Sequence, residues 1–354
     1  MIEQPQADPP PVSDAPEPEH RSEAAQDVTE APFRPDPEPL PEDLDLVAKL
    51  FGRPAPNAAP GRHRAGFVAL VGRPNVGKST LLNAYVGEKV AIVSPKPQTT
   101  RRQILGIRSE PEAQVVFVDT PGLHDPAHAL GRAMVKSANA ALAGADVALW
   151  IVDVSRRPDE ADAAIGRLLR QTGRPTILVL NKADRLRPED IESHSQAWQA
   201  LAEADDWVMT IATKRHNLEA LWQALLLRLP EGPPLYPEDQ LTDQTDRMFV
   251  AELVREAALR YLSEEVPHGI EVIIEDWSQR EDGLLEVAAK IFVERAGHKG
   301  IVIGRGGSML KQIGRAARLE MERALDCRVH LELFVAVRAG WRRDSGELKR
   351  LGFE

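Results

Sequence analysis

The stretch that most constrains this chain is residues 72–80, GRPNVGKST, which fit the phosphate-loop pattern GxxxxGK[ST]. A short apolar run of buried-strand type, residues 66–71, precedes it, and residues 79–86 are typical of the start of a helix. Backbone N–H groups of such a loop, together with the N-terminus of the next helix, can surround a diphosphate. The sequence therefore predicts a nucleotide phosphate site where this strand meets this helix.

Each residue type in the loop has an expected task. We expect Lys78 to reach the outer phosphates and the Ser79 hydroxyl to bind Mg²⁺. Glycines at 72 and 77 leave room for the phosphates because they carry no Cβ. The loop residues expected to bind nucleotide are Gly72, Arg73, Pro74, Asn75, Val76, Gly77, Lys78, Ser79 and Thr80.

Composition divides the 354-residue chain unevenly. Residues 1–60 hold fourteen of the 28 prolines and thirteen Asp or Glu against four Lys or Arg, so most of the net charge of −10 lies there. We interpret this stretch as a disordered acidic tail, in which residues 44–51 form at most a transient amphipathic helix. The remainder is close to neutral, and the overall acidity therefore does not exclude a nucleic-acid partner.

The single cysteine, Cys327, excludes an internal disulfide and fits a reducing compartment. No run approaches the length of a membrane span, and the N-terminus has neither the basic nor the apolar region of a signal peptide. We therefore expect a cytoplasmic protein.

Residues 64–230 alternate between strand and helix patterns, which predicts a doubly wound, mostly parallel α/β sheet. The expected strands are 66–71, 103–108, 114–119, 146–153, 175–180 and 207–212, and the expected helices are 79–86, 129–143, 159–171, 188–204 and 216–228.

A proline-rich segment, residues 231–243, is the clearest linker. Beyond it, residues 244–354 predict a smaller α+β domain with the order α-β-β-α-β. Its expected helices are 244–264 and 307–325, and its expected strands are 269–276, 284–295 and 329–338.

Two further motifs follow predicted strands of the first domain. Asp119, Thr120, Pro121 and Gly122 form DTPG, in which the carboxylate can hold the Mg²⁺ shell and the glycine N–H can meet a γ-phosphate. The second motif, residues 181–184, is NKAD. Both motifs lie where a parallel sheet binds its ligands.

The NKAD motif indicates which base is bound. The two carboxylate oxygens of Asp184 can accept hydrogen bonds from guanine N1–H and N2–H₂, a donor pair that adenine lacks. The Lys182 stem can cover the base, Asn181 can join the loops, and the backbone N–H of Ala212 can meet guanine O6.

Between the first two motifs lies a predicted switch segment. A threonine hydroxyl there can complete the Mg²⁺ coordination, and the sequence does not decide between Thr99 and Thr100. The switch residues are Gln98, Thr99, Thr100, Arg101 and Arg102, and the expected Mg²⁺ ligands are Ser79, Asp119 and one of the two threonines.

The motifs GRPNVGKS, QTTR, DTPG and NKAD together resemble those of the small translation-factor-like GTPases. Leu123 follows DTPG, so the water-positioning glutamine of Ras-type enzymes is missing. Hydrolysis is then either slow and stimulated by a partner, or dependent on another group that positions the water. The resemblance implies that Asn75 helps to bind K⁺ near the phosphates, which we carry over as a hypothesis.

The second domain carries a different motif, GxxG, at residues 304–307, which we interpret as a loop between two short helical segments. In KH domains such a loop clamps the backbone of about four nucleotides. From residue 295 to 319 there are six Arg or Lys and no Asp or Glu, which indicates a local positive patch. The expected RNA-binding residues are Lys299, Ile301, Ile303, Gly304, Arg305, Gly306, Gly307 and Lys311.

A GTPase domain followed by a type II KH domain resembles the Era family of bacterial GTPases, over roughly residue 64 to the C-terminus. The resemblance implies a GTP-hydrolysing factor that binds the 3′ end of small-subunit rRNA and acts in 30S assembly, with RNA binding coupled to the GTP state. It also implies peripheral membrane contact and no DNA partner. The acidic tail is a departure that would be repelled by anionic lipid.

Two alternatives remain from the sequence. One is a GTPase partner in tRNA modification; such proteins carry a cysteine near the C-terminus, whereas Cys327 lies within the second domain. The other is an RNA-binding scaffold with a regulatory nucleotide site, against which the intact Lys78, Asp119 and Asp184 argue.

Overall fold

The structure is a computed structural model that describes residues 63–123 and 128–353. The predictions for residues 1–60, including the helix at 44–51, lie outside the described residues. Within them, no helix combines the length and hydrophobicity needed to span a bilayer.

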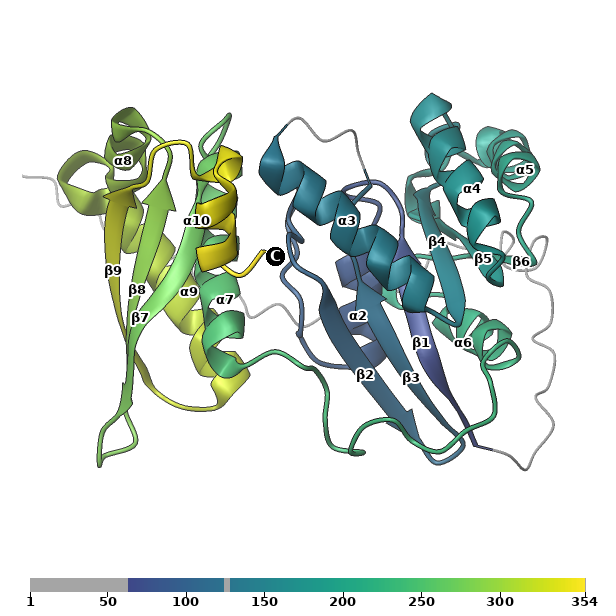
Figure 1. Cartoon of the computed structure of the whole chain (residues 1–354), viewed down its shortest axis with the longest axis horizontal. Coiled ribbons are helices and arrows are strands. Elements are labelled where there is room, and N and C mark those ends of the chain that lie inside the picture. The colour runs from purple at the N-terminus through teal and green to yellow at the C-terminus, as the bar shows by residue number, and fades with distance from the viewer. Residues whose placement is uncertain (1–62, 124–127, 354) are drawn as a thin grey trace, which may run out of the picture. The chain divides into compact units, whose positions relative to one another are not determined.

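The first sheet has six strands in the order β2-β3-β1-β4-β5-β6 (Figure 1). Strand β2 pairs antiparallel with β3, and the other neighbouring pairs are parallel, as predicted for a doubly wound fold. Their bounds are β1 Arg64–Val71, β2 Ile104–Glu110, β3 Ala113–Asp119, β4 Val147–Asp153, β5 Thr176–Asn181 and β6 Asp206–Met209.

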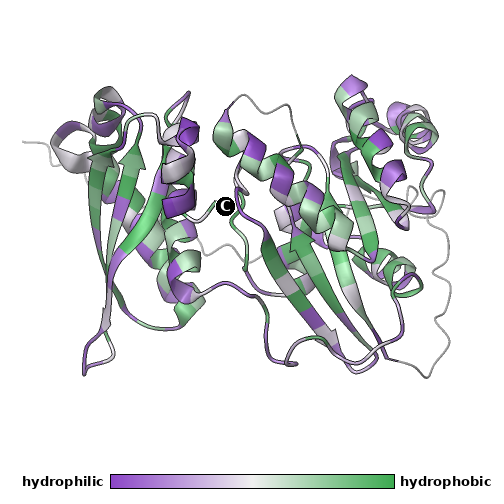
Figure 2. Ribbon diagram, in the orientation of Figure 1, coloured by the Kyte–Doolittle hydropathy of each residue, from purple (hydrophilic) through white to green (hydrophobic). Residues whose placement is uncertain are grey.

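Helices cover both faces of this sheet, which is why its central strands are apolar along nearly their whole length (Figure 2). In β1, Val68 and Leu70 face one core and Ala69 and Val71 face the other. The first core is closed by α2 (Lys78–Val86) and α6 (Leu218–Leu226), and the second by α3 (Ala129–Gly144), α4 (Glu160–Thr172) and α5 (Ile191–Ala202).

The last strand of this sheet is shorter than predicted. Residues 207–212 were expected to be extended, but β6 ends at Met209. Ile211 then pairs with His216, and residues 212–214 form a 3₁₀ turn. The chain leaves the ladder early because it must turn Ala212 back across the strand ends.

The second sheet has the order β7-β8-β9, with β7 antiparallel and β9 parallel to the central strand. The strands are β7 Glu271–Gln279, β8 Leu285–Val293 and β9 Val329–Val337. Two helices, α7 (Asp246–Tyr261) and α9 (Ser308–Leu325), close its core with residues such as Leu253 and Ile313. This is the α+β arrangement of a type II KH domain.

Two short helices lie outside the predicted order α-β-β-α-β, and the first of them is the helical segment expected before the GxxG loop. Helix α8 (Ala296–Ile303) leads into the GxxG loop, and α10 (Ser345–Arg350) follows the last strand. Glycines interrupt the α8 sequence, and α10 has only six residues, so neither gives a periodic apolar pattern.

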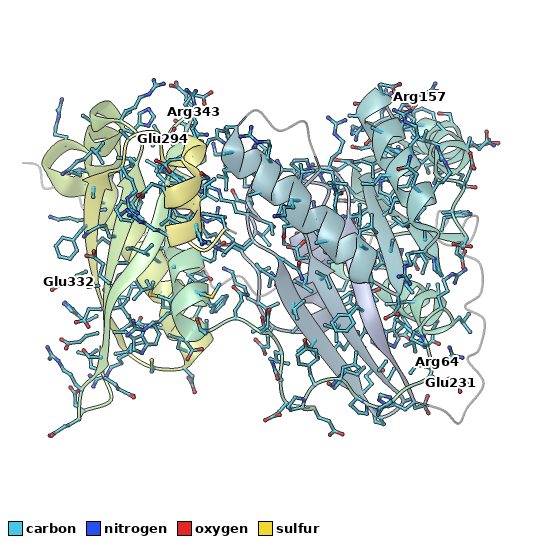
Figure 3. The ribbon with its side chains drawn as sticks, viewed as in Figure 1. Arg64, Arg157, Glu231, Glu294, Glu332 and Arg343 are labelled. Carbon is cyan, nitrogen blue, oxygen red and sulfur yellow. The ribbon has the colours of Figure 1, made fainter. Side chains whose placement is uncertain are left out.

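The linker predicted at residues 231–243 is held along the first sheet. Glu231 forms an antiparallel bridge with Arg64 at the start of β1, and the two lie beside each other in Figure 3. Farther along, Thr242 bridges to Gly106, and the Leu241 carbonyl accepts a hydrogen bond from Ile107 N at 2.8 Å. The start of α7 is therefore tied to β2.

Candidate nucleotide site and RNA-binding surface

A cavity of about 440 Å³ lies at the carboxyl ends of the strands of the first sheet. Its volume is within the usual range for small-molecule sites. The predicted residues that line it are Pro74, Asn75, Gly77, Lys78, Ser79, Thr80, Gln98, Thr99, Thr100, Gly122, Asn181, Lys182, Asp184 and Ala212.

The phosphate loop is shaped by the backbone of Gly77, which caps α2 with φ of 106°. A Cβ there would lie 2.3 Å from Asn181 Nδ2, so only glycine fits. Lys78 is buried, and its Nζ donates to the carbonyls of Gly72 at 3.2 Å and Arg73 at 3.0 Å. Burial lowers the pKa of Lys78 to about 8, although the nearby Asp119 opposes this shift.

Three side-chain oxygens meet beside this lysine. The Ser79 hydroxyl donates to Asp119 Oδ2 at 2.7 Å and lies 2.9 Å from Thr100 Oγ1. Burial raises the pKa of Asp119, partly offset by Lys78 and by the hydrogen bonds from these hydroxyls. The Oδ1 atom of Asp119 is buried and has no hydrogen-bond partner among the described residues.

The two candidate threonines point in different directions. Thr100 Oγ1 donates to Asp119 Oδ2 at 3.2 Å, whereas Thr99 Oγ1 donates to the Lys96 carbonyl at 2.7 Å. Only the hydroxyl of Thr100 therefore joins the cluster of Ser79 and Asp119.

Asn181 joins the loops around the cavity. Its Nδ2 donates to the Val76 carbonyl at 2.8 Å, and its Oδ1 accepts from Ala212 N at 3.0 Å. Lys182 pairs with Asp153 at 2.7 Å, which holds its stem at the cavity, and Asp184 is exposed there. The carboxylate of Asp184 is thus accessible to a base.

Other predicted residues support the cavity without lining it: Gly72, Arg73, Val76, Asp119, Thr120 and Pro121. The Arg73 side chain instead pairs with Asp159 at 2.5 Å. The Thr120 hydroxyl donates to the Leu70 carbonyl at 2.8 Å. A Cβ on Gly122 would lie 2.6 Å from Pro74 N, so DTPG packs directly against the phosphate loop.

Part of the cavity wall was not predicted from the sequence. Residues 92–95 and Arg185 line the cavity, and Asn75 Nδ2 donates to the Pro95 carbonyl at 2.7 Å. The signal that could have indicated these residues was the length of the stretch between residues 86 and 103, where no strand or helix was predicted. Long irregular connections of this kind are often functional.

Two predicted switch residues point elsewhere. Arg101 and Arg102 do not line the cavity, and their side chains contact residues of the KH-type domain.

The GxxG loop follows α8 and precedes the N-terminus of α9. Gly306 and Gly307 have φ of 58° and 79°, and an added Cβ would meet nothing within 4 Å, so the loop is open to a ligand. Ile301 is 52% exposed, whereas its neighbour Val302 is fully buried. Ile303 is half-buried.

The positive patch around this loop is not neutralised by neighbouring acids. Lys299, Arg305 and Lys311 are exposed and make no ion pair within the described part of the chain. Arg318 is the member of the patch that pairs with a carboxylate, that of Glu322 at 2.8 Å. Unpaired cations beside an accessible glycine-rich loop favour a phosphate backbone.

Fold and site together define a GTPase joined to a KH domain. The family model described as "50S ribosome-binding GTPase" matches residues 67–182, and the KH domain model matches residues 265–342. GTPase Era of Clostridium botulinum is 44% identical over 291 residues, which cover 82% of this chain and 98% of that protein. GTPase Era of Ruminiclostridium cellulolyticum is 41% identical with the same coverage.

Two solved structures of Era also match this chain. Era in complex with MgGDPNP and nucleotides 1506–1542 of 16S ribosomal RNA has a TM-score of 0.80 and 39% identity, covering 82% of this chain and 99% of that one. A variant of Aquifex aeolicus Era bound to GDP·AlF₄⁻ has a TM-score of 0.79 with the same identity and coverage. The chain belongs to the Era family of GTPases.

We expect Lys78→Ala to weaken GDP binding by about 10- to 100-fold and to abolish turnover, because a charge-assisted hydrogen bond contributes roughly 1.5–3 kcal/mol. Fluorescent-nucleotide titration and phosphate release measure the two effects. Lys136→Ala, an exposed lysine on α3, is the matched control. Unchanged hydrolysis in Lys78→Ala would contradict the assignment of the phosphate loop.

We expect Asp184→Asn to shift preference from guanine to xanthine nucleotides, because one acceptor becomes a donor. GDP affinity should fall by at least about tenfold and XDP affinity should rise. Competition titrations with both nucleotides measure this, with the exposed Glu189→Gln as control. Retained guanine preference would place base recognition elsewhere.

Proposed function

We propose that this GTPase binds Mg²⁺-GTP in the cavity of the first domain, hydrolyses it to GDP and phosphate, and binds the 3′ end of small-subunit rRNA through its KH loop. Its role is in the assembly of the 30S subunit, with RNA binding coupled to the GTP state. The observation that carries the proposal is the meeting of Ser79, Thr100 and Asp119 beside Lys78. The related Era that holds MgGDPNP and an rRNA fragment supports it.

The oxygens of this cluster fit magnesium. Mg²⁺ prefers hard oxygen ligands and keeps several water or phosphate oxygens. The hydroxyls of Ser79 and Thr100 are placed to bind it directly, and the unpartnered Oδ1 of Asp119 can accept from its water shell. Bound Mg²⁺ would neutralise charge on the β- and γ-phosphates. We therefore assign the switch ligand to Thr100 and not to Thr99.

The remaining predicted residues have compatible roles. Lys78 can exchange its two backbone carbonyl partners for phosphate oxygens. Gly122 lies close enough to the phosphate loop for its N–H to donate to a γ-phosphate. Asp184 selects guanine, and Ala212 N, which here donates to Asn181 Oδ1, would turn from that oxygen toward guanine O6 when the base binds. Together these residues bind and orient GTP.

Hydrolysis needs a group that substitutes for the missing glutamine at Leu123. Asn75 lines the cavity and its Nδ2 donates to the Pro95 carbonyl, so its Oδ1 is the atom that would bind a monovalent cation beside the phosphates. We propose K⁺ as this cation.

RNA binding falls to the loop between α8 and α9. Phosphates would approach Gly304, Arg305, Gly306 and Gly307, the exposed Ile301 would contact a base, and Lys299 and Lys311 would flank the backbone. Ile303 would contribute an apolar edge. This is backbone recognition of single-stranded RNA, and no DNA partner is proposed.

The same proposal places the protein in the cytoplasm. Peripheral contact with the inner membrane, implied by the resemblance, stays a prediction that the described residues do not test.

We expect GTP turnover to be faster in K⁺ than in Na⁺, and Asn75→Asp to remove the difference. Phosphate release in matched chloride buffers measures it, with Asn139→Asp, at an exposed position on α3 outside the cavity lining, as control. Equal rates in both salts for the unaltered protein would dispose of the K⁺ hypothesis.

The central experiment compares an RNA matching the 3′ end of small-subunit rRNA with a scrambled RNA at fixed salt, because electrostatic affinity depends on salt. We expect selective binding that strengthens with a non-hydrolysable GTP analogue over GDP. Arg305→Asp with Gly306→Asp should reduce RNA affinity while nucleotide affinity is retained. Unselective binding would leave the rRNA target unsupported, and joint loss of both activities would show that the two sites are not separable.

A further inference from the structure

The segment from Lys89 to Arg102, between α2 and β2, is held from two sides. On the nucleotide side, Thr100 joins Ser79 and Asp119. On the other side, the carbonyl of the preceding residue, Thr99, accepts a hydrogen bond from Arg255 of α7. Arg255 is fully buried and is also bonded to Glu252, so its direction is fixed.

A second contact follows immediately along the chain. Arg101 and Glu271, at the start of β7, form an ion pair of 2.9 Å in which both side chains are almost fully buried. The same guanidinium donates to the carbonyls of Ile270 and, at 3.0 Å, His268. A buried charge with this many fixed partners cannot shift without losing several of them.

The other end of the segment has an anchor on the same helix. Glu256 of α7 accepts from Val93 N at 2.9 Å and pairs with Lys89 at 2.6 Å. Ile92, between them, is buried in the core of the KH domain. The segment that lines the nucleotide cavity is therefore also part of the packing of the RNA-binding domain.

We propose that Arg255, Glu256 and Glu271 form a latch through which the KH domain senses the nucleotide bound in the first domain. This inference rests on the proposed function, and it names the route of the coupling. Thr99 and Thr100 are consecutive, so a backbone displacement that carries Thr100 toward or away from Mg²⁺-GTP also shifts the Thr99 carbonyl that Arg255 holds. The latch and the γ-phosphate therefore favour the same arrangement of the segment from Lys89 to Arg102, in which Thr100 lies beside Ser79 and Asp119.

Such a link is reciprocal. If GTP strengthens the latch and thereby the RNA-competent arrangement of the KH domain, RNA must strengthen GTP binding by the same factor. Couplings of this type are typically about 5- to 150-fold. None of the latch residues lines the nucleotide cavity or belongs to the GxxG loop, so we expect their replacement to change the coupling more than the affinity of either site.

The test uses the full chain with Arg255→Met, which removes the bond to Thr99 and keeps an apolar stem of similar length. Its matched control is Arg280→Met, which breaks an exposed ion pair with Glu286 in the same domain. RNA affinity is measured with the GTP analogue and with GDP, and analogue affinity is measured with and without RNA.

In the unaltered protein and in Arg280→Met we expect at least about a fivefold ratio of RNA affinities between the two nucleotide states. In Arg255→Met the ratio should approach one in both directions, while RNA affinity with GDP and hydrolysis without RNA are retained. Glu256→Gln, which removes the charge facing Lys89, should also bring this ratio closer to one. This variant replaces Arg255→Met in the test if Arg255→Met does not fold.

An unchanged ratio in folded Arg255→Met and Glu256→Gln would overturn the latch. If the unaltered protein binds its RNA selectively but equally in both nucleotide states, the latch fails together with the coupling part of the proposed function, whereas the rRNA target stands. Loss of RNA selectivity itself, by contrast, would overturn the proposed function.

Discussion

The nucleotide site depends on the buried side chain of Asn181. One amide holds the phosphate loop through the Val76 carbonyl and the base-facing loop through Ala212 N. Without this amide, the Val76 carbonyl and the Ala212 N–H would lose these partners. Because Gly77 carries no Cβ, the amide can approach the loop closely enough to do this. The residue that joins the loops therefore determines the distance between the phosphate and base ends of the cavity.

The chain contains two anion sites built on the same physical plan in unrelated folds. In each, a glycine-rich turn leads into a helix N-terminus, α2 in one domain and α9 in the other. The two sites differ in how far the protein encloses them. Lys78 is buried at the first, which suits a small ligand surrounded on several sides, whereas Arg305 is exposed at the second, which suits a polymer that passes across it.

Much of this was accessible from sequence because local patterns specify it. The phosphate loop, DTPG and NKAD each follow an apolar strand, and parallel strands bring their carboxyl ends to one edge. The choice between Thr99 and Thr100 was not accessible, since both are threonines in one irregular segment and only packing orients them. The partners of Arg101 and Arg102 were also missed, because Glu271 lies 170 residues from Arg101 and no local periodicity reports such a contact.

The attachment of the linker to β2 keeps the start of the KH domain near the segment that it contacts. Leu105 N donates to Asp243 at 3.0 Å, three residues before α7 begins, and Ile104 opens β2 directly after the switch segment. The KH domain is thus tethered by a very short chain close to the segment it contacts. Short tethers give effective concentrations of about millimolar. Re-formation of the contact is then intramolecular and independent of protein concentration, so individually modest bonds are sufficient to hold it.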